Sequence, residues 1–195
     1  FGIFIEELKK IWTDADIEAI EPSEKMANIC RKKNINVIET TVENIDTDKN
    51  KYNLLTSFEL FEHLHNPRLF LNKVYELLNP GGYLFLTTVS SLGFDIQFLW
   101  ENSKSVSPPH HLNFFNPFSI EIIFKKAGFD IVEISTPGKL DWDILEGVFK
   151  HEGNDPGRFL KSVVKYGSVE SKVELQSWIE KNNFSSHMRV IAKKP

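Results

Sequence analysis

Stretches with helical periodicity alternate with short apolar runs along most of this chain. The first stretch carries Ile3, Phe4, Leu8 and Ile11 with charged residues between them, which is the spacing of an amphipathic helix. Short apolar runs between turn-forming residues are typical of strands. The pattern predicts helices over residues 3–11, 24–33, 67–78 and 117–127 and over most of 140–182, with strands over 16–21, 36–40, 52–57, 83–88, 129–135 and 186–193. This alternation indicates an α/β fold with a parallel sheet between helices.

Residues 89–116 interrupt the alternation. This segment holds Pro108 and Pro109 followed by His110 and His111, together with several aromatic residues, and it shows little periodicity. Long segments without regular structure inside a compact domain are usually lids or binding loops. We therefore expect a lid loop over residues 89–116.

Composition and charge narrow the class of protein. The chain has 195 residues, 41% hydrophobic and 26% charged, which suits one globular domain. No apolar run approaches the roughly 18 residues that a membrane-spanning helix needs. The formal net charge of −4 argues against a large nucleic-acid footprint, because such binders neutralise many phosphates. The single cysteine, Cys30, fits a reducing compartment, and we expect the cytoplasm.

One acidic residue stands where doubly wound folds bind nucleotides. Glu21 ends a predicted strand and is followed by Pro22 and Ser23, which open a helix. It lies 19 residues after Gly2, close to the offset of about 20 residues between a glycine-rich turn and a ribose-binding acid. The spacing alone leaves two interpretations equally open, a ribose ligand and a solvated carboxylate at a strand end.

Histidines supply the candidate proton acceptors, since imidazole titrates near neutral pH. Glu59 and His63 are spaced i, i+4 and would share a face of a helix. A metal site that adds His65 can be imagined, but further ligands are missing, so we expect no metal. A catalytic base, a supporting hydrogen bond and a structural histidine stay open for His63. His110 and His111 lie in the predicted lid, where an ordinary surface loop is the alternative.

Taken together, several strings resemble the class I S-adenosylmethionine-dependent methyltransferases. The strings are Phe58-Glu-Leu-Phe-Glu-His-Leu64, Leu78-Asn-Pro-Gly-Gly-Tyr-Leu84 and Pro109-His-His-Leu-Asn-Phe-Phe115, with Gly2 and residues 17–22 before them. The chain is most similar to the small-molecule O-methyltransferase branch that includes ubiquinone-biosynthesis-like and sugar-modifying enzymes. The resemblance implies a Rossmann-like, doubly wound, mostly parallel sheet in three layers with an antiparallel last strand.

The resemblance also implies a domain organisation and a cofactor. It places a single methyltransferase domain over residues 1–195, with a cofactor-binding core over 1–140, a helical cap over 141–183 and a final strand over 184–195. The implied cofactor is S-adenosylmethionine. Its implied contacts are Gly2, Glu21, Pro22, Ser23, Thr41, Val42, Glu43, Ser57, Phe58 and Glu59.

The chain departs from the family pattern in two respects. Thr41 and Val42 stand where the family commonly has Asp-Ala, and Asn53 stands where an Asp is frequent. Only Gly2 remains of the glycine-rich turn that follows the family's first strand. The family topology puts that strand in the centre of the sheet, between the strands that end at Glu21 and Ser57. We therefore expect further residues before Phe1 in the natural protein, because two buried strand edges would otherwise lack partners.

The function implied by the resemblance is methyl transfer to a small molecule, with a hydroxyl as the expected acceptor. The reaction is an in-line displacement, and His111 is the first candidate for the base, with His63 and His110 as rivals. The alternative is a non-catalytic nucleotide-binding or interaction module of the same fold. A nicotinamide dehydrogenase is disfavoured, because the sequence contains no Gly-x-Gly-x-x-Gly.

Overall fold

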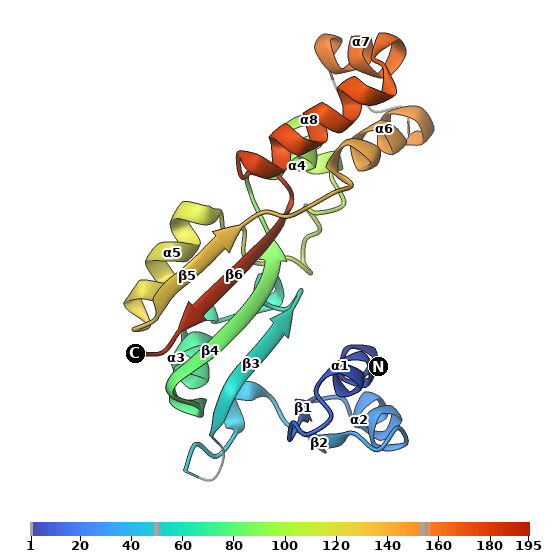
Figure 1. Cartoon of the computed structure of the whole chain (residues 1–195). Helices are drawn as coiled ribbons and strands as arrows, with labels where there is room; N and C mark the ends of the chain where they lie inside the picture. Colours follow the sequence, from blue (N-terminus) through green and yellow to red (C-terminus); the bar gives the residue numbers. More distant parts are fainter. Residues whose placement is uncertain (1, 49–50, 153–154, 156) are drawn as a thin grey trace. The chain divides into compact units, whose positions relative to one another are not determined.

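The computed structural model describes residues 2–48, 51–152, 155 and 157–195. The chain divides into two compact units, residues 1–51 and residues 52–195. We call them the N-terminal unit and the C-terminal unit and describe each by itself (Figure 1).

The N-terminal unit is a small α/β element built on two parallel strands. It contains α1 (Ile3–Ile11), β1 (Glu18–Ile20), α2 (Glu24–Arg31), β2 (Asn36–Ile38) and the 3-10 helix η1 (Val42–Asn44). Ala19 of β1 pairs with Val37 of β2. Helix α2 begins at Ser23, whose hydroxyl accepts a hydrogen bond from the Met26 amide. Both strands are shorter than the sequence predicts, with three residues each.

The C-terminal unit is built on a four-stranded sheet. Its strands are β3 (Tyr52–Phe58), β4 (Leu78–Val89), β5 (Asp130–Ser135) and β6 (His187–Lys193), in the order β3-β4-β6-β5. Strands β3 and β4 are parallel, and β6 is antiparallel to both of its neighbours. The prediction of an antiparallel last strand is therefore confirmed, as is the α/β fold class.

The helices of this unit make two apolar clusters. They are α3 (Pro67–Leu77), α4 (Phe94–Leu99), α5 (Pro117–Lys126), α6 (Asp141–Glu152), α7 (Arg158–Tyr166) and α8 (Val169–Lys181), with the 3-10 helices η2 (Phe61–His63) and η3 (Trp100–Asn102). In the first cluster, the buried ring of Phe61 contacts the rings of Phe70 in α3 and Phe124 in α5. The second joins α4, α6 and α8 through Phe94, Trp142 and other buried side chains. Burial of these large apolar side chains holds the helices in place.

The described strands form two sheets, and β1 and β3 belong to different ones.

Two local predictions need correction. Residues 89–116 are not without regular structure, because α4 and η3 lie within them; α4 has only six residues, too few to show a period in the sequence. Residues 79–82, whose Asn-Pro-Gly-Gly sequence predicts a turn, lie within β4. Tyr52 pairs with Leu78 and Leu54 with Tyr83. Residues 79–82 therefore form a bulge opposite a single residue of β3, Asn53. Residues 153–157, whose Gly-Asn-Asp-Pro-Gly sequence predicts a turn between the helices of 140–182, lie largely outside the described residues.

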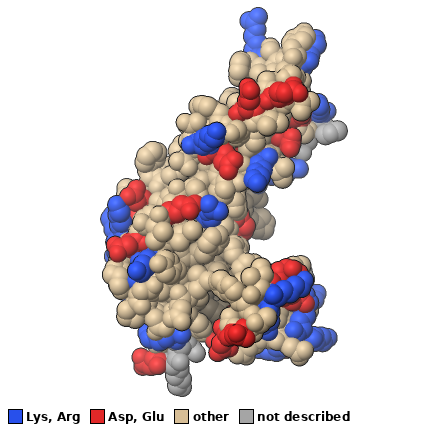
Figure 2. All heavy atoms as spheres, viewed as in Figure 1, with Lys and Arg blue, Asp and Glu red and all other residues tan. Residues whose placement is uncertain are grey.

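Surface charge is mixed. On the face seen in Figure 2, basic side chains lie among acidic ones, without a broad patch of one sign outside the grey atoms. Within the described ranges, no helix combines the length and the apolar character that crossing a membrane requires.

Candidate functional site

The carboxyl ends of β3 and β4 and the start of β6 meet at one edge of the four-stranded sheet (Figure 1). Phe58 of β3 pairs with Thr87 of β4, and Val89 of β4 pairs with His187 of β6. In open α/β sheets, ligands bind outside the carboxyl ends of the parallel strands. This edge is therefore the candidate site of the C-terminal unit.

Glu59 follows β3 directly and is fixed against β4. Its backbone adopts a φ of 47°, in the left-handed region, and its amide donates to the Thr87 carbonyl oxygen at 3.1 Å. Oε1 of Glu59 accepts from the Thr87 hydroxyl at 2.7 Å and lies 3.2 Å from Nδ1 of His187. Sequence reasoning missed His187, because only the pairing of β6 with β4 brings it to this edge.

Glu59 and His187 shift one another's pKa. Burial raises the pKa of the Glu59 carboxyl, but hydrogen bonds from His187 and Thr87 outweigh it and hold the pKa below its ordinary value. The hydrogen bond to Glu59 raises the pKa of the His187 imidazole above its ordinary value, against the opposing effect of burial. Both shifts favour the ionised pair.

His63 and His111 lie next to each other, as their ring centroids are 4.8 Å apart with a T-shaped geometry. Nδ1 of His63 lies 2.8 Å from the His110 carbonyl oxygen, and Nδ1 of His111 lies 2.7 Å from the Ser105 carbonyl oxygen. Because a carbonyl oxygen only accepts, each Nδ1 carries the proton and donates it. In the neutral rings, both Nε2 atoms are consequently hydrogen-bond acceptors. His110 has an exposed side chain and contributes its carbonyl to this arrangement.

The buried Glu62 joins the η2 segment to β4 and to the loop that contains Leu112 and Asn113. Its Oε2 accepts from the Thr88 hydroxyl at 2.8 Å, while its backbone carbonyl accepts from the amides of Leu112 and Asn113. The Asn113 side chain in turn donates to the Leu64 carbonyl oxygen at 2.6 Å. These bonds fix the loop that carries His111 against the η2 segment.

No helix spans residues 59–63, so Glu59 and His63 do not share a helical face. Instead, Glu62 lies beside His63 and His111, and donor atoms of these three residues lie within 4.8 Å of one another. In the described part of the chain this is the one group of acidic, histidine or cysteine side chains spaced for a metal ion. It shares only His63 with the metal set considered from the sequence.

Two further predicted site residues end β3. Ser57 is buried, and its hydroxyl has no hydrogen-bond partner among the described residues. The Phe58 ring is 40% exposed and lies 5.7 Å from the Phe85 ring.

In the N-terminal unit, Glu21 and Thr41 lie at the edge where the two parallel strands end. The Glu21 amide donates to the Ile38 carbonyl oxygen, which places Glu21 beside the end of β2. One carboxylate oxygen, Oε1, accepts from the Ser23 amide at 2.9 Å. Thr41 precedes η1, which contains the predicted Val42 and Glu43, and the exposed Pro22 leads into α2.

Gly2 precedes α1 with a φ of 74°, a conformation that favours glycine. A Cβ atom there would lie 2.5 Å from Cδ1 of Ile35, so the end of the Ile35 side chain would have to move. The position therefore favours glycine for its backbone conformation.

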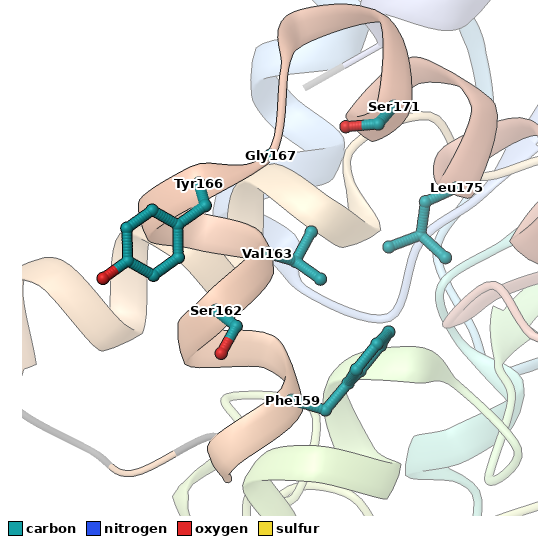
Figure 3. A pocket seen from close by; sticks show the side chains of 7 residues that line it. All are labelled: Phe159, Ser162, Val163, Tyr166, Gly167, Ser171 and Leu175. Atoms are coloured by element: carbon teal, nitrogen blue, oxygen red, sulfur yellow. The ribbon is translucent and has the colours of Figure 1, made fainter.

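A hollow of about 470 Å³ lies between α7 and α8. Figure 3 shows Phe159, Val163 and Leu175 pointing into it. Its lining is mostly apolar and consists of Phe159, Ser162, Val163, Tyr166, Gly167, Ser171 and Leu175. None of these residues was predicted from the sequence as a site residue.

Residues 2–134 match a family model described as a methyltransferase domain. Among curated proteins, the mitochondrial ubiquinone biosynthesis O-methyltransferase of Dictyostelium discoideum is 25% identical over 136 residues, which are 62% of this chain and 41% of that protein. The ubiquinone biosynthesis O-methyltransferase of Rickettsia typhi is 29% identical over 77 residues, 38% of this chain and 31% of that protein. The chain thus spans about two fifths or less of the length of these relatives.

Solved structures share the fold at lower identity. A plantazolicin methyltransferase in complex with S-adenosylhomocysteine (SAH) has a TM-score of 0.63 at 16% identity, with 99% of this chain and 72% of that chain covered. A possible histamine N-methyltransferase from Thermotoga maritima has a TM-score of 0.56 at 19% identity, with 92% and 73% covered. These neighbours confirm the Rossmann-like architecture.

Proposed function

Because this chain belongs to the methyltransferase domain family, we propose that it transfers a methyl group from S-adenosylmethionine to a hydroxyl of a small molecule. The family match over residues 2–134 is the observation that carries the proposal. The names of the curated relatives, ubiquinone biosynthesis O-methyltransferases, support an oxygen acceptor.

Polar groups at the strand ends fit the cofactor. Oε1 of Glu21 accepts from the Ser23 amide, and Oε2 has no hydrogen-bond partner among the described residues, so the carboxylate can still accept from a ribose hydroxyl. The buried Ser57 hydroxyl, without a partner in the described ranges, can bind a polar group of the methionine moiety. The proposed cofactor contacts are Gly2, Glu21, Pro22, Ser23, Thr41, Val42, Glu43, Ser57, Phe58 and Glu59.

His63 and His111 are proposed to face the acceptor. Their Nε2 atoms accept hydrogen bonds when the rings are neutral, so either can bind an acceptor hydroxyl. His110 lies beside them and holds the His63 ring through its carbonyl. Fixing the acceptor oxygen in line with the methyl group can remove about 7–11 kcal/mol of the barrier.

The proposal assigns a role in methyl transfer to each part of the chain. Residues 1–140 would bind the cofactor, with residues 89–116 as the lid, while the helices within 141–183 would shape the acceptor pocket and 184–195 would complete the sheet. The acceptor is proposed to be a small molecule rather than a nucleic acid, in line with the net charge of −4. A cytoplasmic location is proposed from the single cysteine.

The test is an acceptor panel. The protein is incubated with S-adenosylmethionine that carries a labelled methyl group and with catechols, simple phenols, sugars and carboxylates in separate reactions. Label in a hydroxyl-bearing acceptor, together with an equal amount of SAH, is the expected result. Binding of SAH without transfer to any member of the panel would favour the non-catalytic module instead.

A further inference from the structure

Contacts with neighbouring residues hold His187 at the sheet edge that carries the candidate site. It is the first residue of β6 and pairs with Val89, the last residue of β4. Its side chain is 45% exposed, and Nδ1 lies 3.2 Å from Oε1 of Glu59. The ring is thus held through Nδ1, while Nε2 has no hydrogen-bond partner among the described residues.

The carboxylate that holds this ring is itself fixed. The Thr87 hydroxyl donates to Oε1 of Glu59 at 2.7 Å, and the Glu59 amide donates to the Thr87 carbonyl oxygen at 3.1 Å. A carboxylate that is anchored on a strand in this way orients its imidazole partner.

The backbone before His187 is held by two buried aspartates. Asp141, at the start of α6, accepts from the Ser185 hydroxyl at 2.8 Å and from the Ser186 amide at 2.8 Å. Asp95, in α4, accepts from the Ser186 hydroxyl. Both carboxylates are nearly inaccessible to solvent. Residues 185–186, which precede His187, are therefore fixed by buried hydrogen bonds although His187 itself is half exposed.

We infer that His187 is the general base of the proposed methyl transfer and that Glu59 is its positioning residue. The inference rests on the proposed function. Nε2 of His187 takes the proton of the acceptor hydroxyl, and the oxygen lone pair forms the new bond to the methyl carbon. The bond between that carbon and sulfur breaks, and its electron pair stays on sulfur as neutral SAH. The imidazolium then returns its proton to water.

A carboxylate held at Nδ1 distinguishes His187 from the loop histidines. Oε1 of Glu62 lies 4.0 Å from Nε2 of His63, which is the atom that would have to take the proton. When an imidazole takes a proton it becomes a cation, which an adjacent carboxylate stabilises. Nδ1 of His63 and of His111 donates to a neutral carbonyl, whereas Nδ1 of His187 donates to Glu59. The other charged groups that act on His187 are Glu62 and Asp141, which are also acidic.

These acidic neighbours define the expected pH dependence. The hydrogen bond to Glu59 raises the pKa of His187, and only the neutral ring can act as a base. The turnover rate should therefore fall as the pH decreases through this raised pKa. In Glu59→Gln the pKa should be lower, and the fall should move to lower pH.

The first experiment measures the pKa of His187 and does not require methyl transfer. The histidine ring carbons are labelled with ¹³C, and the protein is titrated by NMR, with the His187 signal identified by its loss in His187→Gln. The expected result is a His187 pKa above about 6.5, the ordinary value, which decreases in Glu59→Gln. An unshifted pKa that is insensitive to Glu59→Gln would overturn the inference.

The second experiment measures turnover with the fastest acceptor of the panel. His187→Gln should lower kcat by about 100-fold or more, and the decrease in turnover rate at low pH should disappear. The affinity for SAH should be unchanged. His65→Gln, which changes an exposed histidine after η2, is the matched control and should keep the wild-type profile.

The outcomes separate this inference from the function on which it rests. Wild-type turnover and pH profile in His187→Gln, with normal SAH affinity, would overturn the assignment of His187 alone. If the decrease in turnover rate at low pH disappears in His111→Ala rather than in His187→Gln, the general base is His111 and the inference is overturned. Absence of both SAH binding and methyl transfer in the wild-type protein would overturn the proposed function and the inference together.

Discussion

The Asn113 side chain donates to the backbone carbonyl of Leu64 at 2.6 Å, across 49 positions of sequence. This bond joins the loop that carries His111 to the residue that follows η2, and the backbone amide of Asn113 donates a second bond to the Glu62 carbonyl oxygen at 3.0 Å. The geometry of His63 relative to His111 depends on these two anchors.

Removal of the Asn113 side-chain amide should therefore weaken the attachment of this loop to the η2 segment. Asn113→Ala leaves the Leu64 carbonyl without this donor, and the expected loss of unfolding free energy is about 1–3 kcal/mol. Denaturant unfolding measures it. Asn28→Ala, which removes an exposed bond to Arg31, is the control and should stay within about 0.5 kcal/mol of wild type. Equal effects of the two substitutions would show that Asn113 is not an anchor.

Helix α5 should depend on its N-terminal cap. Oδ1 of Asn116 accepts from the amides of Phe118 and Ser119, and the Ser119 hydroxyl accepts from the Asn116 amide. Asn116→Ala should cost about 0.5–2 kcal/mol of unfolding free energy, whereas Asn116→Ser, which keeps a capping oxygen, should cost much less. Thermal unfolding of the two variants side by side checks the difference, and equal losses would contradict a capping role.

Glu21 should contribute directly to cofactor affinity. Glu21→Ala should weaken SAH binding by about 1.5–3 kcal/mol, the range for hydrogen bonds to charged groups, as read by titration calorimetry. Glu18→Ala is the matched control, because Glu18 is the first residue of β1, which ends just before Glu21, and its carboxylate accepts a hydrogen bond from the Asn36 side chain on the surface. If Glu21→Ala and Glu18→Ala bind SAH as wild type does, Glu21 does not contact the ribose.

The Glu59–His187 pair should stabilise the protein only within a window of pH. The pKa of His187 is raised on folding, so its contribution is present below about pH 6.5 and is lost as the pH rises through the raised value. The pKa of Glu59 is lowered, so its contribution is present above about pH 4.3 and is lost as the pH falls through the lowered value. The pair should contribute most between these limits.

A double-mutant cycle of Glu59→Gln and His187→Gln measures this contribution. Because both side chains are nearly half exposed, the coupling free energy should be at most about 1 kcal/mol near pH 5.5, and it should decrease toward pH 9. A coupling that is the same at both pH values would contradict an ion pair.

Local signals explain which parts of the fold could be predicted from the sequence. Helix α5 carries Asn116 as a cap, Pro117 at its first position and apolar residues at helical spacing, and its predicted start is confirmed. Strand β6 alternates buried and accessible residues and was also predicted. Helix α4 could not be predicted because it has only six residues and includes buried Asp95, whose partner Ser186 lies 91 positions away in the sequence.

The site was less predictable because it depends on contacts between distant segments. The strings around His63 and His111 singled out both histidines, but the bond from His63 to His110 spans 47 positions. The neighbour of these rings is Glu62 rather than Glu59, because the left-handed backbone at Glu59 turns its side chain toward Thr87 and His187. No periodicity in the sequence encodes that turn.

Titration calorimetry of the wild-type protein with SAH tests the central claim most directly. The proposed function predicts saturable binding with one site per chain, competition by S-adenosylmethionine and weaker binding in Glu21→Ala. Absence of binding heat with SAH at concentrations up to about 1 mM, which corresponds to a binding free energy weaker than about −4 kcal/mol, would contradict a methyltransferase that uses this cofactor.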